Sequence, residues 1–464
     1  LTIKLLGENM PLEVKPRKRI LLWCSPGFGV VDIWLPVIRK LKEKGGVTID
    51  FVFPEPSSLR LEDKDSDLFN FSEQFANKVI YRGYSGRWFI SDTLIEASAG
   101  IKFSGVDRKI SNISAVFLKG RLSKYFFLNW IGKIISGVFR KIIYIKENLS
   151  HSTLYDTSLF ENASGILCDI TAEGKLVNKE LTDECSNILK FSMLHGLAPH
   201  WVTHRLISKD SVTRRNDVRV YSMSNLEENW YKKYFGILDD NLMQVGIPRH
   251  DSDWIDFISR NSHSTENNMF DKFVFIIGRP AGPYNTSERK SKALRNIYDI
   301  VCKKHKLKLV IKTHPKESLN GIDGNIYSTA LGLKNYGKDW MYSNSHPFVI
   351  GKRAIFSISF FSGVPLDMLA INKPTIEYLD LSGLTLYDNC NSLRDIRGKP
   401  VFEFSYTNLV LSASSKLELR QHVELILNNY DPTLYKLREK YKFFFRPYDN
   451  SSEIVAKDIY KNLS

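Results

Sequence analysis

Short apolar runs that end in turn residues alternate with longer amphipathic segments along most of the chain. The first unit comprises the run RILLWCS (19–25), a predicted glycine loop PGFG (26–29), the helical pattern WLPVIRKLKEKG and the run VTIDFVFP (47–54). Runs of about four to eight apolar residues between turn signals are typical of buried strands. This alternation predicts a layered α/β architecture.

The same alternation fills two regions of the chain. In the first region the further strand candidates are SAVFLKG, GILCD (165–169), KFSMLHG (190–196), VRVYSMS (218–224) and LMQVGIP (242–248). In the second region they are KFVFIIG (272–278), KLVIKTH (308–314), AIFSIS (354–359) and PTIEYLD (374–380). A polar stretch without periodicity, ISRNSHSTENNMFD, separates the two regions and reads as a linker.

We therefore predict two Rossmann-like, doubly wound α/β domains that face each other across a cleft. A chain of 464 residues is long enough for two such domains. The N-terminal, acceptor-side domain is expected at 1–257, the linker at 258–271 and the C-terminal, nucleotide-donor-binding domain at 272–435. Residues 436–464 are expected to form a helix that packs back on the N-terminal domain.

The composition of the chain limits the kinds of molecule that the protein is expected to bind. The net charge of +14 favours anionic partners, but no RNA-binding motif is present and we expect no nucleic acid ligand. The five cysteines are scattered and form no CxxC pair, which argues for a reducing cytoplasm and against a disulfide framework or a zinc site. Residues 1–18 contain no apolar core of a signal peptide, so a cytoplasmic location is expected.

One segment could contact a membrane surface. Read as a helix, KYFFLNWIGKIISGVFRKIIYIKE (124–147) has one narrow polar stripe, a broad apolar face and lysines near its flanks. Such a basic amphipathic helix can lie on the anionic inner face of the cytoplasmic membrane. The alternative is a core helix with one hydrated edge.

Candidate chemistry lies where the predicted strands end, because ligands of doubly wound sheets bind at the carboxyl ends of strands. In VIKTHPKES, His314 precedes Pro315, which forces extended backbone and fixes the direction of the imidazole. With Lys312 beside it, His314 could bind a phosphate oxygen. The alternative is a structural histidine.

Two further loops of the second region could bind a phosphate group. Ser359, Ser362 and Gly363 follow the next strand and precede a predicted helix, where hydroxyl and backbone N–H groups can bind an anion. Ser362 could equally be only a helix cap. In FIIGRPAGPYN, Gly278 would let the backbone approach a diphosphate and Arg279 would supply positive charge.

The first region offers general-base candidates. His195 follows a predicted strand, and an imidazole can accept a hydroxyl proton near neutral pH. Asp169 and Glu173, in the loop after another strand, are the other candidates for the base. Arg249 follows a Gly-x-Pro turn and could bind the donor, or form a salt bridge with Asp251 that fixes the loop.

The order of these motifs resembles the CDP-glycerol glycerophosphotransferase family of teichoic-acid polymerases. The resemblance covers roughly residues 185–460 and is carried by HG (195–196), VGIPRHD (245–251), the strand and loop at 275–285, HP (314–315), SGVPLDMLAINKPTIEY and the tail RPYDNSSEIVAKDIY. The HP and serine motifs are also similar to those of bacterial sialyltransferases and Kdo transferases, which use CMP-sugars. In those enzymes an acidic residue before a glycine is the base, and Glu173 resembles it.

This resemblance implies a GT-B fold and a transfer that needs no metal or other cofactor. It implies that His314 and Ser362 hold the donor phosphate and that His195 is the base or another residue on the acceptor side. The implied activity is transfer of a glycosyl or polyol-phosphate unit from a CMP- or CDP-linked donor to a glycan or lipid-linked glycan acceptor in bacterial surface polysaccharide assembly. Phe360 and Gly363 replace an aspartate and a serine of the polymerase motif, which leaves the transferred unit open.

Two other functions stay open. A UDP-sugar-dependent GT-B enzyme, either a glycosyltransferase or an epimerase, would have the same two-domain cleft. An epimerase would need acidic pairs that flank its UDP-sugar. A basic binding module without enzymatic activity would not require His195 and His314 at strand ends in two separate domains.

Overall fold

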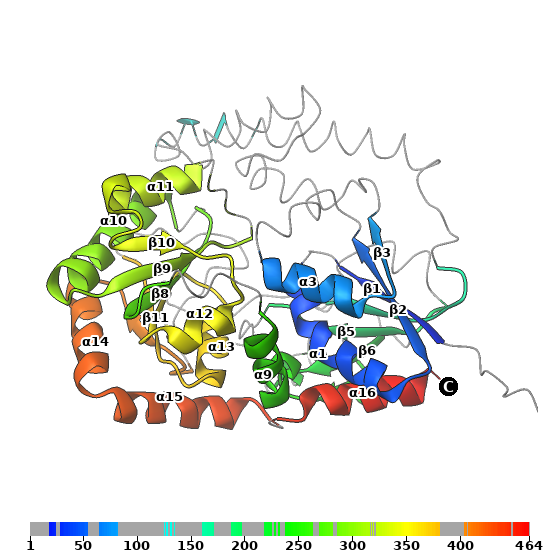
Figure 1. Ribbon diagram of the computed structural model, residues 1–464. Helices are drawn as coiled ribbons and strands as arrows, with labels where there is room; N and C mark the ends of the chain where they lie inside the picture. The colour runs from blue at the N-terminus through cyan, green and yellow to red at the C-terminus, as the bar shows by residue number, and fades with distance from the viewer. Residues whose placement is uncertain are drawn as a thin grey trace, which may run out of the picture.

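The computed structural model describes residues 18–24, 28–53, 65–81, 125, 127–128, 130–131, 134, 160–170, 187–196, 218–224, 227–228, 231–232, 237–262, 269–281, 285–315, 317, 319, 322–380, 403–405, 407–446 and 449–463. Within these ranges the chain forms two parallel-sheet α/β domains side by side (Figure 1). The predicted strand SAVFLKG (114–120) and Glu173 lie outside the described residues.

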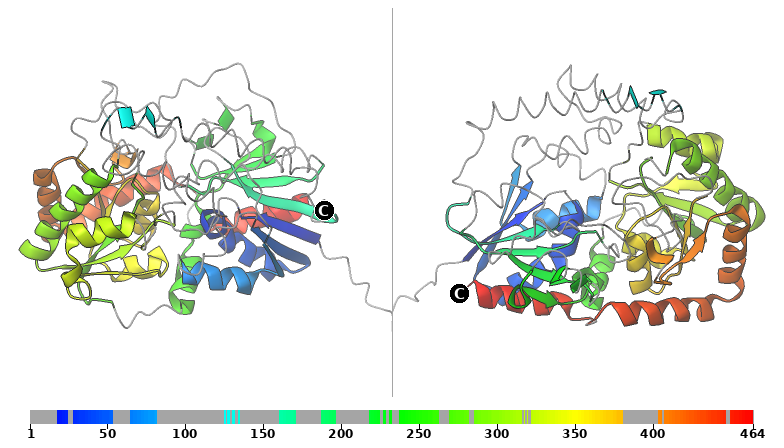
Figure 2. Two further views of the ribbon diagram at one scale, coloured as in Figure 1. Left: turned by 90° about the horizontal axis from the view of Figure 1, so that it is seen from above. Right: turned by 180° about the vertical axis from the view of Figure 1, so that it is seen from behind.

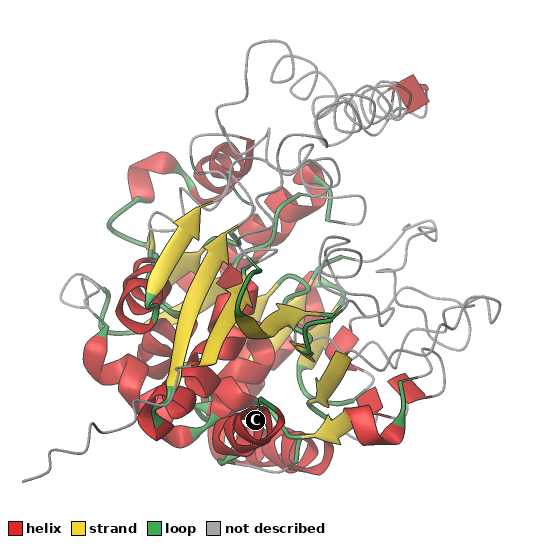
Figure 3. Ribbon diagram, turned by 90° about the vertical axis from the view of Figure 1, so that its right-hand side faces the viewer, coloured by secondary structure: helices red, strands yellow, loops and turns green. Residues whose placement is uncertain are grey.

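The N-terminal domain contains a seven-stranded sheet of order β3-β2-β1-β4-β5-β6-β7, which Figure 3 shows in side view. Its strands are β1 (Lys18–Trp23), β2 (Val47–Phe53), β3 (Lys78–Tyr81), β4 (Ala163–Asp169), β5 (Lys190–Met193), β6 (Val218–Ser222) and β7 (Leu242–Gln244). All neighbouring strands are parallel, so their carboxyl ends share one edge. The strand order changes direction between β1 and β4, which is the point where such sheets open a crevice.

The C-terminal domain contains a six-stranded parallel sheet of order β10-β9-β8-β11-β12-β13. Its strands are β8 (Phe273–Ile277), β9 (Lys308–Lys312), β10 (Trp340–Tyr342), β11 (Ser357–Ser359), β12 (Thr375–Tyr378) and β13 (Leu411–Ala413). The direction changes between β8 and β11. Two doubly wound domains, as predicted, are thereby confirmed.

Helices cover the sheets and join the domains. They are α1 (Phe28–Lys44), α3 (Ser66–Phe75), α9 (Ser252–Asn261), α10 (Ser287–Ile297), α11 (Ile322–Leu331), α12 (Pro347–Arg353), α13 (Val364–Ala370), α14 (Lys416–Asn428), α15 (Tyr430–Phe444) and α16 (Ser451–Asn462). Short 3-10 helices are η7 (Asp239–Asn241), η8 (Pro248–His250), η11 (Leu333–Asn335) and η12 (Glu403–Ser405), and η10 (Tyr298–Lys304) is a π-helical segment that continues α10.

Helix α1 begins earlier than the sequence predicted. It starts at Phe28, so Gly29 belongs to its first turn and not to a loop. The glycine is required for close packing, because a Cβ atom at position 29 would lie only 2.6 Å from Cδ2 of His195. Gly29 therefore makes room for the side chain of His195, whereas the sequence pattern indicated that it forms a turn.

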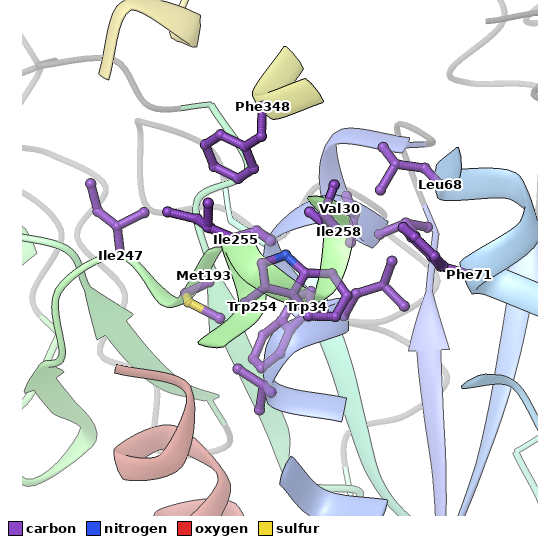
Figure 4. Packing of buried hydrophobic residues seen from close by; sticks show 14 of the residues in the cluster. Val30, Trp34, Leu68, Phe71, Met193, Ile247, Trp254, Ile255, Ile258 and Phe348 are labelled. Atoms are coloured by element: carbon purple, nitrogen blue, oxygen red, sulfur yellow. The ribbon is translucent and has the colours of Figure 1, made fainter. Parts of the chain in front are cut away.

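Apolar packing is continuous from one domain to the other. Figure 4 shows Trp34 of α1, Trp254 and Ile258 of α9, and Phe348 of α12 in one packed group. All four side chains are buried. Helix α9, which follows β7 and η8 in the chain, packs against α12 and so contributes to the apolar contact between the two domains.

The last two helices run along one side of both domains (Figures 1 and 2), and α16 packs against α1. The predicted boundary at 257/258 lies inside α9, and the one at 435/436 lies inside α15. Both helices connect the domains, so a boundary drawn where the composition changes cuts through them. In the described ranges, no helix is long and apolar enough to cross a membrane.

Candidate functional site

A cavity of about 340 Å³ lies between the two domains, at the carboxyl ends of both sheets. Its lining includes these predicted residues: His195, Arg249, Gly278, Arg279, Lys312, His314, Pro315, Ser362 and Gly363. The fold thus brings together residues from loops that are more than a hundred positions apart in the sequence. The volume is in the range of about 300–1,000 Å³ that is usual for small-molecule sites.

His195 and Asp169 form a hydrogen-bonded pair at the edge of the N-terminal sheet. Asp169 ends β4 and His195 follows the adjacent strand β5, so parallel register brings them together. Nδ1 of His195 lies 2.5 Å from Oδ2 of Asp169, and the backbone N–H of His195 donates to Oδ1 over 2.8 Å. The imidazole is one-third exposed and lines the cavity, whereas the carboxylate is buried.

This pair assigns different roles to two residues that the sequence offered as equivalent bases. A carboxylate on Nδ1 holds the proton on that nitrogen and leaves the lone pair on Nε2. His195 is therefore the group that can accept a proton in the cavity, and Asp169 orients it. The third candidate, Glu173, lies outside the described residues.

On the opposite side of the cavity, two loops of the C-terminal domain meet. His314 and Pro315 follow β9, and Arg279 follows β8. The Arg279 guanidinium donates to the carbonyl of Phe361. Phe361 adopts φ of 55°, a left-handed conformation that a bulky residue rarely takes outside functional sites. Sequence reasoning missed Phe361, because backbone strain leaves no sequence signal.

The serines of the next loop differ from the expectation. Ser362 lines the cavity, and its Oγ also accepts the backbone N–H of Val364 over 3.3 Å, but the N-cap residue of α13 is Gly363 and not Ser362. Ser359 is fully buried inside β11 and does not belong to the lining formed by the described residues. The prediction that Ser359 contacts the donor is therefore not supported by its position.

Arg249 is buried between two carboxylates from different domains. Its Nη1 lies 2.5 Å from Oδ2 of Asp32 in α1, and its Nη2 lies 2.8 Å from the carboxylate of Asp367 in α13. Burial alone would raise the pKa of Asp32, but the positive charge of Arg249 and a hydrogen bond from His346 outweigh it and lower the pKa to about 2. The charge of Arg249 is thus balanced by these two carboxylates, and its expected role in donor binding stays a prediction.

Like Arg249, Lys312 forms an ion pair with a carboxylate of the other domain. Its Nζ lies 2.7 Å from Oδ2 of Asp65, the N-cap residue of α3, and also donates to the carbonyls of Asn344 and Ser345. Asp65 and Lys312 both line the cavity and come from different domains. Lys312 and Arg249 therefore join the domains beside the site. A sequence pattern can indicate that Asp65 caps a helix, but not which distant lysine it binds.

Within the ranges that the structure describes, no group of three or more His, Cys, Asp or Glu side chains could hold a metal ion. The expectation of a reaction without metal or other cofactor stays a prediction.

Comparisons with known proteins identify the fold. No protein-family model matches the chain, and no curated protein matches its sequence. Among solved structures, S. aureus MnaA solved with UDP has a TM-score of 0.53 at 11% identity, over 96% of this chain and 98% of that one. The UDP-GlcNAc 2-epimerase from Neisseria meningitidis, bound to UDP-GlcNAc, has a TM-score of 0.52 at 12% identity, over 96% and 100% of the two chains.

A variant of the wall teichoic acid polymerase TagF is also similar, with a TM-score of 0.47 at 12% identity over 97% of this chain and 89% of that one. At this score the likeness adds nothing to the fold assignment. The structures of MnaA and of the Neisseria epimerase match almost the whole chain, and with the two parallel sheets they establish the fold. The protein has a GT-B fold, two Rossmann-like domains that face each other across a cleft.

Proposed function

We propose that this protein is a GT-B transferase of bacterial cell-envelope glycan assembly. It moves a glycosyl or polyol-phosphate unit from a nucleotide-activated donor to a hydroxyl group of a glycan acceptor. The observation that carries the proposal is the buried Asp169 carboxylate 2.5 Å from Nδ1 of His195, in a cavity whose other wall contains His314 and Arg279.

The chemistry follows from these positions. Nε2 of His195 accepts the proton of the acceptor hydroxyl, and the hydroxyl oxygen forms the new bond to the transferred unit. The bond between that unit and the nucleotide phosphate breaks, and the nucleotide leaves with the bonding electron pair. His314 and Arg279 stabilise the negative charge that develops on the leaving phosphate.

The donor that we propose carries a pyrimidine nucleotide. The sequence motifs resemble those of enzymes that use CMP- and CDP-linked donors. S. aureus MnaA and the Neisseria enzyme were solved with UDP or UDP-GlcNAc, which favours a uridine donor. A cytidine donor and a uridine donor therefore both belong in the test.

An epimerase that acts on a UDP-sugar is the second candidate, and the fold likeness to the UDP-GlcNAc 2-epimerase from Neisseria meningitidis favours it. Such an enzyme needs no second substrate. The two functions therefore differ in a simple observable, which is whether a nucleotide sugar changes in the absence of a glycan acceptor.

Two single variants on opposite walls of the cavity test the transferase. His314→Ala should lose nucleotide binding. His195→Ala should retain it and lose transfer of labelled sugar to extracted envelope glycans by about a hundredfold or more. Proton NMR of UDP-GlcNAc, incubated with the enzyme but without a glycan acceptor, tests for epimerase activity. Appearance of a 2-epimer there, with no transfer to glycan, would contradict the transferase and establish the epimerase.

We also propose that the enzyme works on the cytoplasmic face of the membrane. Phe127 and Trp130 stack at 6.0 Å between ring centroids while remaining 64% and 51% exposed, and Ile134 is also exposed. Their spacing of three and four residues puts them on one helix face, and lysines flank the segment. Most of 124–147 lies outside the described residues.

Sedimentation with vesicles tests this surface. The wild type should pellet with vesicles that contain phosphatidylglycerol, and Phe127→Ser/Trp130→Ser should reduce the bound fraction severalfold. Leu417→Ser, at another exposed apolar position, serves as the control. Equal binding of the wild type and the double variant would contradict the proposed contact.

A further inference from the structure

A buried charge cluster lies in the C-terminal domain behind the loops that line the cavity. It consists of Lys290 in α10, Glu317, and Asp323 in α11. Lys290 and Glu317 have no exposed surface, and Asp323 is buried. Charged groups are rarely buried this completely unless they are paired and hydrogen-bonded. None of the three lines the cavity as the described residues define it, so none is expected to touch a substrate.

Each carboxylate holds one of the two cavity loops by its backbone. Oε2 of Glu317 accepts the N–H of His314 over 2.6 Å, and the N–H of Glu317 donates to the carbonyl of His314 over 2.8 Å. Oδ1 of Asp323 accepts the N–H of Ala281, three residues after Gly278, over 3.2 Å. Glu317 therefore fixes the His314 turn, and Asp323 fixes the 278–281 loop.

Lys290 joins these two anchors. Its ammonium group contacts Oε1 of Glu317 and lies 3.3 Å from Oδ1 of Asp323. It also lies 4.3 Å above the ring of Tyr327, whose hydroxyl donates to Oε1 of Glu317 over 3.0 Å. The carboxylates repel each other, so the lysine between them sets their separation.

The loops also touch directly at this point. A Cβ atom added to Gly278 would lie 2.4 Å from Oε2 of Glu317 and 2.7 Å from the hydroxyl oxygen of Tyr327. The absence of a side chain at Gly278 lets the first loop lie against the carboxylate that holds the second loop.

We infer that Lys290 is a positioning residue that, through Glu317 and Asp323, holds the His314 turn and the 278–281 loop at one fixed spacing. This rests on the proposed function, in which the two loops grip one donor phosphate group. The cluster orients the backbone that carries His314 and Arg279, and it acts on the donor only through them.

Hydrogen exchange of the ligand-free protein tests the arrangement. Lys290→Met should accelerate exchange about tenfold or more in peptides from both 277–281 and 312–317. Glu317→Gln leaves Lys290 paired with Asp323, so it should fold, and it should loosen only the His314 turn. Lys308→Met is the matched control, since Lys308 also pairs with a carboxylate, Asp339, that accepts a tyrosine hydroxyl. It should change neither loop.

Measurement of nucleotide affinity distinguishes a positioning role of Lys290 from a role in stability alone. With UDP and CMP as probes, Lys290→Met should weaken binding about tenfold or more. Adding Glu317→Gln to Lys290→Met should weaken it little further, because the lysine acts on the His314 turn through Glu317. If Lys290→Met does not fold, Glu317→Gln provides the same comparison.

The possible failures are distinguishable. Unchanged exchange in both loops of Lys290→Met would overturn the inference, as would uniform loosening of the whole C-terminal domain or no loosening of the His314 turn in Glu317→Gln. If the wild type binds no nucleotide, the proposed function fails, while the exchange pattern still decides whether Lys290 couples the loops.

Discussion

His195 and Asp169 are 26 positions apart, and their contact depends on the register of two parallel strands. The sequence placed each of them at a strand end and so identified both as candidates for the base. It could not show that β4 and β5 are neighbours, because that pairing is a property of the sheet. The distinction that we propose, with His195 as the base and Asp169 as the carboxylate that orients it, therefore required the structure.

The pair makes a prediction for activity. Asp169→Asn keeps a hydrogen-bonding group beside Nδ1 but removes the charge that stabilises a protonated imidazole. We expect the transfer rate to fall about tenfold or more, with little change in nucleotide affinity. The measurement is kcat beside a nucleotide titration. Equal loss of nucleotide affinity would contradict an orienting role.

Glu227 gives a prediction for stability against pH. It is buried behind β6 and accepts the backbone N–H of Met223 over 2.6 Å, and burial raises its pKa from 4.5 to about 7. A carboxyl with a raised pKa stabilises the fold fully below 4.5 and loses this contribution as pH rises through 7. By pH 8 the loss is about 3 kcal/mol.

Glu227→Gln should therefore unfold at higher urea concentration than the wild type at pH 8, with the two proteins closely similar at pH 4.5. The adjacent Glu228→Gln is the control, because Glu228 is paired with Lys232 near the surface. A pH-independent difference for Glu227→Gln would contradict the assignment.

At the level of single residues, the sequence does not show which charged side chains are buried. His314 could be predicted because proline fixes the backbone before it and a strand precedes it. Lys290 could not, since in SERKSKALRNI it reads as one of several exposed basic positions of an amphipathic helix. Asp32 is equally hidden within the helical segment after the first strand. Only the tertiary contacts show that these charges are enclosed.

Among the elements, the central strands and the edge strand β7 were predictable, and the other three edge strands were not. Strands β8 and β9 are continuous apolar runs because helices cover both faces of a parallel sheet. The sequence analysis missed β3, β10 and β13, which are four residues or shorter and lie at sheet edges. Too few residues are present there to establish a periodicity.

Helix α16 offers a test of one element. The buried carboxylate of Asp251 accepts the N–H groups of Ser451 and Ser452 at the start of α16, over 3.0 and 2.8 Å. Asp251→Ala removes these bonds and should lower the free energy of unfolding by about 2 kcal/mol. Urea denaturation measures the loss. Asn450→Ala is the control, because the Asn450 side chain makes no capping bond. Equal losses would contradict the anchor.

At the scale of the whole molecule, Arg249 connects the two domains through its contacts with Asp32 and Asp367. Arg249→Met would leave Asp32 and Asp367 buried without their shared counter-ion, and loss of such a partner costs about 3–5 kcal/mol. In the wild type, the depressed pKa of Asp32 stabilises the fold above pH 3.8, and this contribution is lost as pH falls through about 2.

The cost of Arg249→Met should therefore be large at pH 7 and shrink below about pH 4, where the carboxylates can take up protons. Thermal unfolding at both pH values is the measurement. Arg420→Met, which breaks an exposed pair with Glu424, is the control and should change little. A constant difference across pH would contradict the buried bridge.

In the function that we propose, the cavity between the domains holds a pyrimidine nucleotide against His314. The most direct measurement is thermal stabilisation by CMP, CDP, UMP, UDP and GDP, on the wild type and on His314→Ala. A nucleotide at a hundred times its Kd should add about 2.7 kcal/mol of stability. We expect stabilisation of the wild type by a cytidine or uridine nucleotide but not by GDP, and loss of that stabilisation in His314→Ala. Stabilisation by no nucleotide, or an equal effect in the variant, would contradict it.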